Sequence, residues 1–250
     1  MAIDLLKKKV GIVLEKRKLP QVTCEVKFAL DISGSMQGLY DNGTVQNLTD
    51  RLLAVASRFD DNGEMEVWTF TNGFSEAPVV NESMHEGYIN KHILNNRNIE
   101  KWGGTSYAPV MIDIINQSFT EEKKVVTQVE QQPGFFGKLF GAKPSVTTVE
   151  SFEVGAREPK FPIFVPFVTD GDNSDHDQAE RVIKECAGKN IYWMMVGIGS
   201  ERFSWLKKIA DKYPNVGFIK IENLETVSDE DFYMQLLNEE FCNWVKKFAK

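Results

Sequence analysis

The sequence predicts an α/β domain with a doubly wound, mainly parallel sheet and helices on both faces. Short apolar runs rich in β-branched and aromatic residues recur along the chain, as is typical of strands buried on both faces. Amphipathic helical segments alternate with these runs, and such alternation builds a parallel sheet between two helical layers. With 250 residues, 42% hydrophobic and 26% charged, the composition is that of an ordinary globular chain.

An N-terminal helix and linker are expected over residues 1–21. Apolar residues recur there at helical spacing, at Ile3, Leu6, Val10, Val13 and Leu14. Lysines 7–9 interrupt the apolar stretch and no small-residue cleavage site follows, so the segment is not a typical secretion signal. No run approaches the ~18 apolar residues that a membrane span needs. We therefore expect a cytoplasmic protein.

The main domain is expected over residues 22–250. Its predicted strands are 24–30, 64–70, 161–169, 191–199 and 216–221. Its predicted helices include segments within 48–59, 110–119 and 179–187. Pro162 and Pro166 lie in one of these strands, and irregular pairing is expected there because proline lacks the N–H of the ladder.

The last helix is expected over 229–249. Ser228 is in the position of an N-cap, acidic residues occupy the first turn and lysines the last. Its apolar residues recur on one side of the helix, so this side is expected to pack on the domain.

Residues 120–160 interrupt the alternation of strands and helices. Two Val/Thr-rich segments flank the Gly/Pro-containing stretch PGFFGKLFGAKP, which favours a β-hairpin insertion with an apolar tip. The tip contains Phe135, Phe136, Leu139 and Phe140. Two interpretations stay open: the tip contacts a partner or a membrane, or it folds back on the domain.

Three polar stretches follow or adjoin the predicted strands. DISGS (31–35) directly follows the first strand, TDG (169–171) ends a later one, and KWGGTSYAP (101–109) precedes a helix. If the two strands are neighbours, Asp31 and Asp170 lie at the same edge and the Thr105 loop can cover them. Together with Ser33 and Ser35 they would present two carboxylates and three hydroxyls. Oxygen donors without His or Cys suit Mg²⁺, or Mn²⁺ and Ca²⁺, rather than zinc.

This donor set predicts a binding site rather than a catalytic one. If the hydroxyls of Ser33, Ser35 and Thr105 bind directly and the aspartates act through water, little negative charge reaches the ion. Mg²⁺ takes roughly six oxygen ligands. A position is therefore left for an acidic residue of a protein partner.

Other interpretations come from the same residues. Taken singly, Asp31 can be a turn former, and Ser33 and Ser35 can simply end a strand. A Mg²⁺-dependent phosphoryl hydrolase of the HAD type, with Asp31 as nucleophile, is the alternative function, but it requires a second aspartate where Ser33 stands. The net charge of −7 argues against nucleic-acid binding.

The aspartates that follow Asp170 invite a further interpretation. Asp172, Asp175 and Asp177 could form a second acidic cluster, but their spacing is not that of a calcium loop. Acidic residues at the N-terminus of the next helix explain them more simply.

The combination of motifs resembles a known family. DxSxS after the first strand, the threonine of a Gly-Gly-Thr loop and the aspartate of TDG resemble the metal-ion-dependent adhesion site (MIDAS) of von Willebrand factor A (vWA) domains. The resemblance covers roughly residues 22–225. Within the family the chain looks most like bacterial cytoplasmic vWA proteins associated with tellurium resistance. It implies a non-enzymatic interaction module whose metal ligands are Asp31, Ser33, Ser35, Thr105 and Asp170.

Overall fold

The computed structural model describes residues 3–60, 62–131 and 145–248. The chain divides into two compact units. The first combines Met1–Ile114 with Pro159–Lys250, and the second is Ile115–Glu158.

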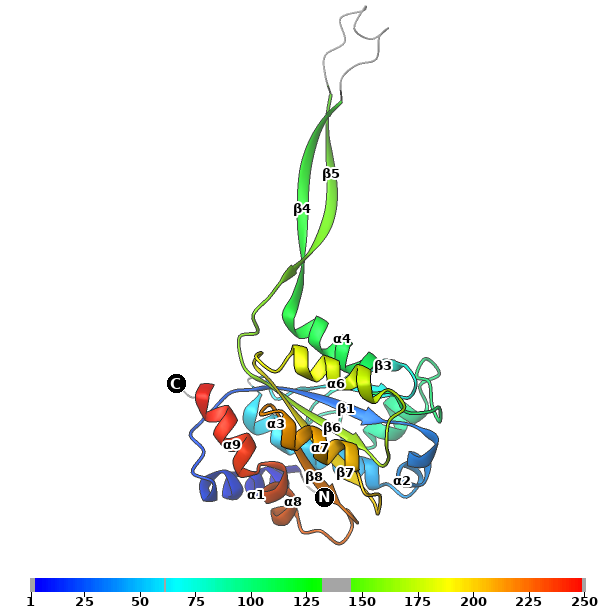
Figure 1. Cartoon of the computed structure of the whole chain (residues 1–250), viewed down its shortest axis with the longest axis vertical. Helices are drawn as coiled ribbons and strands as arrows, with labels where there is room; N and C mark the ends of the chain where they lie inside the picture. The colour runs from blue at the N-terminus through cyan, green and yellow to red at the C-terminus, as the bar shows by residue number, and fades with distance from the viewer. Residues whose placement is uncertain (1–2, 61, 132–144, 249–250) are drawn as a thin grey trace, which may run out of the picture. The chain divides into compact units, whose positions relative to one another are not determined.

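The first unit contains a six-stranded sheet in the order β3-β2-β1-β6-β7-β8 (Figure 1). All neighbouring strands pair in parallel except β2 and β3, which are antiparallel. The strands are β1 (Glu25–Asp31), β2 (Met65–Phe70), β3 (Phe74–Val80), β6 (Ile163–Thr169), β7 (Ile191–Ile198) and β8 (Val216–Ile221). This arrangement confirms the predicted fold class.

Helices cover both faces of this sheet (Figure 1). One face carries α1 (Ile3–Lys16), α3 (Thr44–Phe59), α8 (Asp229–Leu236) and α9 (Glu239–Val245). The other carries α4 (Ala108–Phe119), α6 (His176–Glu185) and α7 (Ser204–Lys212). Every residue of β7 is buried: Tyr192 and Met194 belong to the core under the first set of helices, whereas Trp193 contacts Cys186 just beyond α6. Burial on both sides explains the continuous apolar runs of the sequence.

The N-terminal helix has the expected apolar side. Ile3, Leu6, Val10 and Val13 are buried, and α1 packs against α3 and α8. Helical spacing was sufficient to predict which residues are buried, but not which helices they contact.

The prolines of β6 disturb its pairing with β1 as expected. The β1 partners are Ile163, Phe164, Phe167 and Val168, so the ladder passes over Val165 and Pro166. Pairing with β7 on the other side runs without a break. Pro162 precedes the strand, and its carbonyl accepts a hydrogen bond from the Glu25 N–H at 3.0 Å.

The single C-terminal helix expected over 229–249 is wrong. The segment forms α8, α9 and a short 3₁₀ turn, η3 (Lys246–Phe248). Leu237 leaves the helical conformation, and the Asn238 side chain caps α9 by accepting the Phe241 N–H at 2.9 Å. The sequence does not predict this break, because apolar residues recur at helical spacing through both helices and pack on the same core. The N-cap predicted at Ser228 is present, since its hydroxyl accepts the Asp231 N–H at 3.1 Å.

Several elements were not predicted. They are β3, the short helices η1 (Gly34–Met36) and α2 (Gln37–Asp41), the π-helix η2 (Ile89–Leu94), and α7. β3 is an edge strand whose sequence, FSEAPVV, contains Pro78 and is largely solvent-facing. Proline and partial exposure are typical of edge strands and weaken the strand signal.

The second unit contains an antiparallel pair, β4 (Thr120–Gln131) and β5 (Ser145–Ala156). It corresponds to the hairpin expected within 120–160. The predicted apolar tip, with Phe135, Phe136, Leu139 and Phe140, lies outside the described residues.

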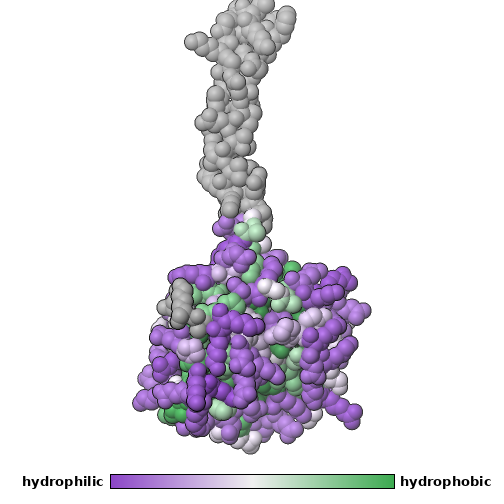
Figure 2. Space-filling model, turned by 60° about the vertical axis from the view of Figure 1, so that its left-hand side comes forward, coloured by the Kyte–Doolittle hydropathy of each residue, from purple (hydrophilic) through white to green (hydrophobic). Residues whose placement is uncertain are grey.

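The face of the first unit that Figure 2 shows is mainly polar. Figure 2 shows hydrophilic residues predominating on the face in view, with small apolar patches between them. Among the described residues, no helix has the length and hydropathy required to cross a membrane.

Candidate metal centre

The topology of the sheet places two of the predicted polar stretches, DISGS (31–35) and TDG (169–171), at the same edge. The chain runs outward from β1 to β2 on one side and returns to β6 on the other, so strand order reverses between β1 and β6. Ligands of doubly wound sheets bind beyond the carboxyl ends of the strands at this switch point. Asp31 is the last residue of β1, and Asp170 directly follows β6.

Asp31 is fully buried and held by two hydrogen bonds. Its Oδ1 accepts the Ser33 backbone N–H at 2.7 Å, and its Oδ2 accepts the Thr169 hydroxyl at 2.7 Å. The Tyr40 hydroxyl donates to the Asp31 carbonyl at 2.9 Å. These contacts leave the carboxylate with one defined orientation at the end of β1.

A chain of oxygen atoms joins the β1 and β6 loops. Ser33 Oγ lies 3.2 Å from Ser35 Oγ, and the Ser35 hydroxyl donates to Asp170 Oδ1 at 2.8 Å. Asp31, Ser33, Ser35 and Asp170 are therefore placed close together, as the sequence predicted.

The Thr105 loop is attached to the same edge through its backbone. The Trp102 N–H donates to the Ile32 carbonyl at 2.8 Å, and the Gly103 carbonyl accepts the Gly34 N–H at 3.0 Å. Packing is close at this loop, since a Cβ at Gly103 would lie 3.0 Å from the Cβ of Thr71. Thr105 lines a cleft of about 620 Å³ together with Ser35 and Asp170. Three of the five predicted ligands thus line one cleft, and Ser33 lies next to it, with its Oγ 3.2 Å from Ser35 Oγ.

Asp175 has a different role from the one expected. Its carboxylate accepts the N–H groups of Tyr107 and Ala108 at 2.9 and 2.8 Å, so it caps α4 rather than the helix that follows it. The Ser174 N–H also donates to the Thr105 carbonyl at 2.9 Å. The β6–α6 loop therefore positions the Thr105 loop.

The electrostatics of the site favour a cation. Burial raises the pKa of Asp31 to about 6, hydrogen bonds from Ser33 and Thr169 oppose this rise, and the Asp170 carboxylate adds to it. Burial also raises the pKa of Asp170, with a smaller contribution from Glu201. Among the interactions that the described residues make with these two carboxylates, none involves a basic side chain. A divalent cation would supply the missing positive charge.

The donor chemistry fits a hard cation. Within the described ranges, no group of three or more His, Cys, Asp or Glu side chains is placed to hold a metal. The candidate site differs from such clusters because hydroxyls make up most of its donors. Hard oxygen donors suit Mg²⁺, Mn²⁺ or Ca²⁺.

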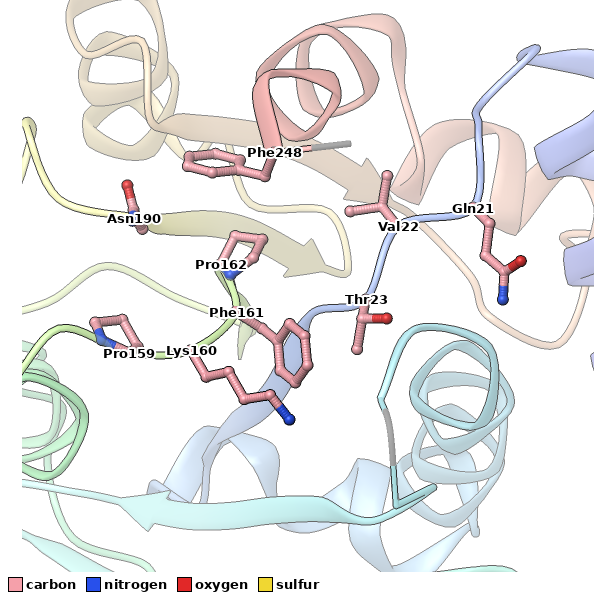
Figure 3. Close-up of a pocket in the computed structure, with 9 residues that line it drawn as sticks. All are labelled: Gln21, Val22, Thr23, Pro159, Lys160, Phe161, Pro162, Asn190 and Phe248. Carbon is pink, nitrogen blue, oxygen red and sulfur yellow. The ribbon is translucent and has the colours of Figure 1, made fainter. Parts of the chain in front are cut away.

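A second hollow, of about 510 Å³, lies at the amino-terminal ends of β1, β6 and β7 (Figure 3). Phe161, Pro162, Val22 and Phe248 contribute apolar groups, and Lys160 lies beside the Phe161 ring. None of its lining residues is acidic, so it offers a metal ion no carboxylate.

Sequence reasoning missed several residues that shape the site. Thr169 orients Asp31, and Tyr107 Oη lies 3.2 Å from Thr169 Oγ1 and 2.9 Å from the Gly171 carbonyl oxygen. Leu39, Ile198 and Glu201 line the cleft beside the predicted ligands. Thr169 could have been found, because it precedes Asp170 at the end of a predicted strand. The other residues could not have been found, because they lie in segments that are far apart in the sequence and meet only in the folded chain.

A family model described as "vWA found in TerF C terminus" matches residues 23–134 and 136–250. The chain belongs to the TerF-like vWA family. A curated relative of this vWA chain, "Uncharacterized protein YcbR" of Bacillus subtilis (strain 168), is 36% identical over 249 residues, covering 98% of the chain and 87% of that protein.

Solved structures show the same fold. Proximal thread matrix protein 1 from the mussel byssus matches with a TM-score of 0.54 and 15% identity, over 89% of this vWA chain. The chain spans about half the length of that protein, 49%. One structure of the mussel protein has a zinc-occupied MIDAS motif (TM-score 0.53, 14% identity, 89% of this chain and 48% of that one). Manganese-loaded TRAP protein of Plasmodium vivax matches with a TM-score of 0.50 and 14% identity, over 88% of this chain and 74% of that one.

Proposed function

We propose that this vWA chain is a non-enzymatic interaction module that binds an acidic protein partner through a divalent metal. The metal ligands would be Asp31, Ser33, Ser35, Thr105 and Asp170. The observation that carries the proposal is the chain of hydroxyl and carboxylate oxygens at the sheet edge. It lies beside the buried Asp31 carboxylate, whose contacts among the described residues include no basic side chain.

The two kinds of donor have different tasks. Asp31 and Asp170 offset the charge of the ion, while the hydroxyls of Ser33, Ser35 and Thr105 bind without neutralising it further. When bound, a divalent ion supplies a positive centre that attracts a partner's carboxylate. We favour Mg²⁺ because the donors are all hard oxygens, and Mn²⁺ and Ca²⁺ fit the same chemistry.

The comparisons support this proposal at the level of the family. Two proteins with the same fold are described as holding zinc or manganese, the zinc in a MIDAS motif. The match to a TerF-type family supports a further proposal, that the chain acts in tellurium or stress resistance. Its expected cytoplasmic location remains a prediction. The comparisons give no support to the HAD-type alternative.

Metal binding can be tested with a matched pair of variants. We expect Mg²⁺ to bind the wild-type chain and Thr105→Ser in calorimetric titrations, because serine keeps the hydroxyl, and to bind Thr105→Ala more weakly. At about 100 times its dissociation constant, Mg²⁺ should add about 2.7 kcal/mol to the free energy of unfolding. Circular dichroism of the metal-free proteins checks that all three fold. Equal Mg²⁺ affinity of the three proteins would contradict the assigned ligand set.

Partner binding requires a second experiment. Immobilised wild-type chain should retain its partner in Mg²⁺ and release it in EDTA, and the Thr105→Ala chain should not retain it. Substitution of one acidic residue of the partner by its amide should then abolish retention. Retention that persists in EDTA would refute the metal bridge. Mg²⁺-dependent hydrolysis of para-nitrophenyl phosphate that is lost in Asp31→Asn would instead favour the hydrolase.

A further inference from the structure

The cleft that contains the predicted metal ligands has an acidic lining. Asp172 and Glu201 line it in addition to the predicted ligand Asp170. Both side chains are exposed, and the Glu201 carboxylate is near enough to raise the pKa of Asp170. Asp172 contacts the His176 ring at 2.7 Å. In the part of the chain that the structure describes, the residues that line the cleft include no lysine, arginine or histidine.

The basic side chains close to the cleft leave Glu201 without an ionic partner. Lys220 donates to the carbonyl of Ser200, a lining residue, at 3.4 Å, but it pairs with Glu222 at 3.3 Å. Arg202 is exposed and is not among the lining residues. Within the described ranges, the Glu201 carboxylate forms no hydrogen bond or ion pair. Its charge is therefore available to a ligand that enters the cleft.

A bound divalent ion does not neutralise this cleft. Four carboxylates lie at or beside it, those of Asp31, Asp170, Asp172 and Glu201. The ion offsets two of these four charges, and a partner's carboxylate on the ion then adds a further negative charge. Like charges that meet at an interface disfavour the complex. A partner segment that carries only acidic residues is thus a poor fit.

We propose that the partner segment combines its metal-binding carboxylate with a lysine or arginine whose cation pairs with Glu201. The inference rests on the proposed function and specifies the chemistry of its partner. Leu39 and Ile198 also line the cleft, and lysine and arginine cover such apolar groups with their aliphatic stems while the charged head stays in water. The net charge of −7 attracts a basic segment at longer range. Glu201 therefore selects among the carboxylates that the metal can bind.

A selection from random peptides tests the proposal. A library of short peptides displayed on phage is bound to the immobilised wild-type chain in Mg²⁺ and released with EDTA. The released peptides should contain an aspartate or glutamate with a lysine or arginine close to it in sequence. Selection on the Glu201→Gln chain should keep the acidic residue and lose the basic one. Glu185→Gln removes the same charge at the C-terminal end of α6 and should select the same peptides as the wild-type chain.

A charge exchange measures the effect of the pair. In one selected peptide, replacement of the basic residue by glutamate should weaken binding to the wild-type chain about fivefold, the effect of a well-formed exposed ion pair. The Glu201→Lys chain should bind the original peptide more weakly by a similar factor and bind the glutamate peptide as well as the wild-type chain binds the original. Circular dichroism checks that the variants fold.

A titration with Mg²⁺ alone separates partner selection from metal binding. Glu201→Gln should change the Mg²⁺ affinity by less than about fivefold, because Glu201 is an exposed charge and not a predicted ligand. A larger loss would make Glu201 part of the metal site and overturn its assignment to the partner.

The selection distinguishes failure of this inference from failure of the proposed function. Released peptides with an acidic residue but no basic preference would overturn the inference and leave the metal bridge standing. A basic preference that persists on the Glu201→Gln chain would overturn the role of Glu201. If EDTA releases no peptide, the metal bridge itself is refuted, and the inference is refuted with it.

Discussion

Asp31 should make the metal-free protein less stable as the pH rises. Its pKa is about 6 in the folded protein instead of the ordinary 3.8, because burial disfavours the carboxylate form. The folded state therefore binds the proton more tightly than the unfolded state. The resulting stabilisation is present below about pH 3.8 and is lost as the pH rises through about 6. At about 1.4 kcal/mol per pKa unit the full loss is about 3 kcal/mol, of which about 2.4 kcal/mol falls between pH 4 and pH 7.

The Asp31→Asn variant isolates this effect. The amide cannot ionise, its oxygen can still accept the Ser33 N–H, and its NH₂ can donate to the Thr169 hydroxyl. We expect the variant to gain about 2.4 kcal/mol over the wild-type protein between pH 4 and pH 7. Urea unfolding of both proteins, freed of metal and followed by tryptophan fluorescence at several pH values, measures this difference.

Comparison of the two proteins at each pH cancels the titration of all other groups. Asp41→Asn makes the same change at an exposed residue and should follow the wild-type pH dependence. If Asp31→Asn and wild type lose stability in parallel from pH 4 to pH 7, the reasoning about the buried carboxylate is refuted.

Three further predictions concern the fold, and urea unfolding measures each. Asn238→Ala should lower the free energy of unfolding by about 1 kcal/mol, because α9 loses its side-chain cap; an unchanged value would contradict this assignment. Gly197→Ala should cost about 1–3 kcal/mol, because a Cβ there would lie 2.8 Å from the Phe203 ring, and full stability would show that the ring moves freely. Phe241→Ala should cost about 3–5 kcal/mol, because its buried ring packs against the aromatic rings of α3, β6 and β7; a loss below 1 kcal/mol would contradict this packing.

Local sequence was sufficient for most of the architecture. Apolar runs buried on both faces predicted five strands of the sheet, and helical spacing predicted α1, α3, α4 and α6, because both signals arise from neighbouring residues. The candidate ligands could also be predicted, since Asp31 and Asp170 each follow a strand and parallel strands end at the same edge. β3 was missed because its sequence lacks a clear strand period, whereas Trp205, Leu206 and Ile209 of α7 lie at helical spacing and could have predicted that helix.

Contacts between distant segments decided the rest. The break between α8 and α9 depends on how Leu237 and Phe241 pack on the core, which a continuous apolar pattern does not reveal. The cap that Asp175 provides to α4, and the hydrogen bond from Thr169 to Asp31, join residues 67 or more positions apart. The sequence alone determines which chemical group each donor carries. The distances, burial and raised pKa values that make these donors a cation site arise only when the tertiary structure removes them from water together.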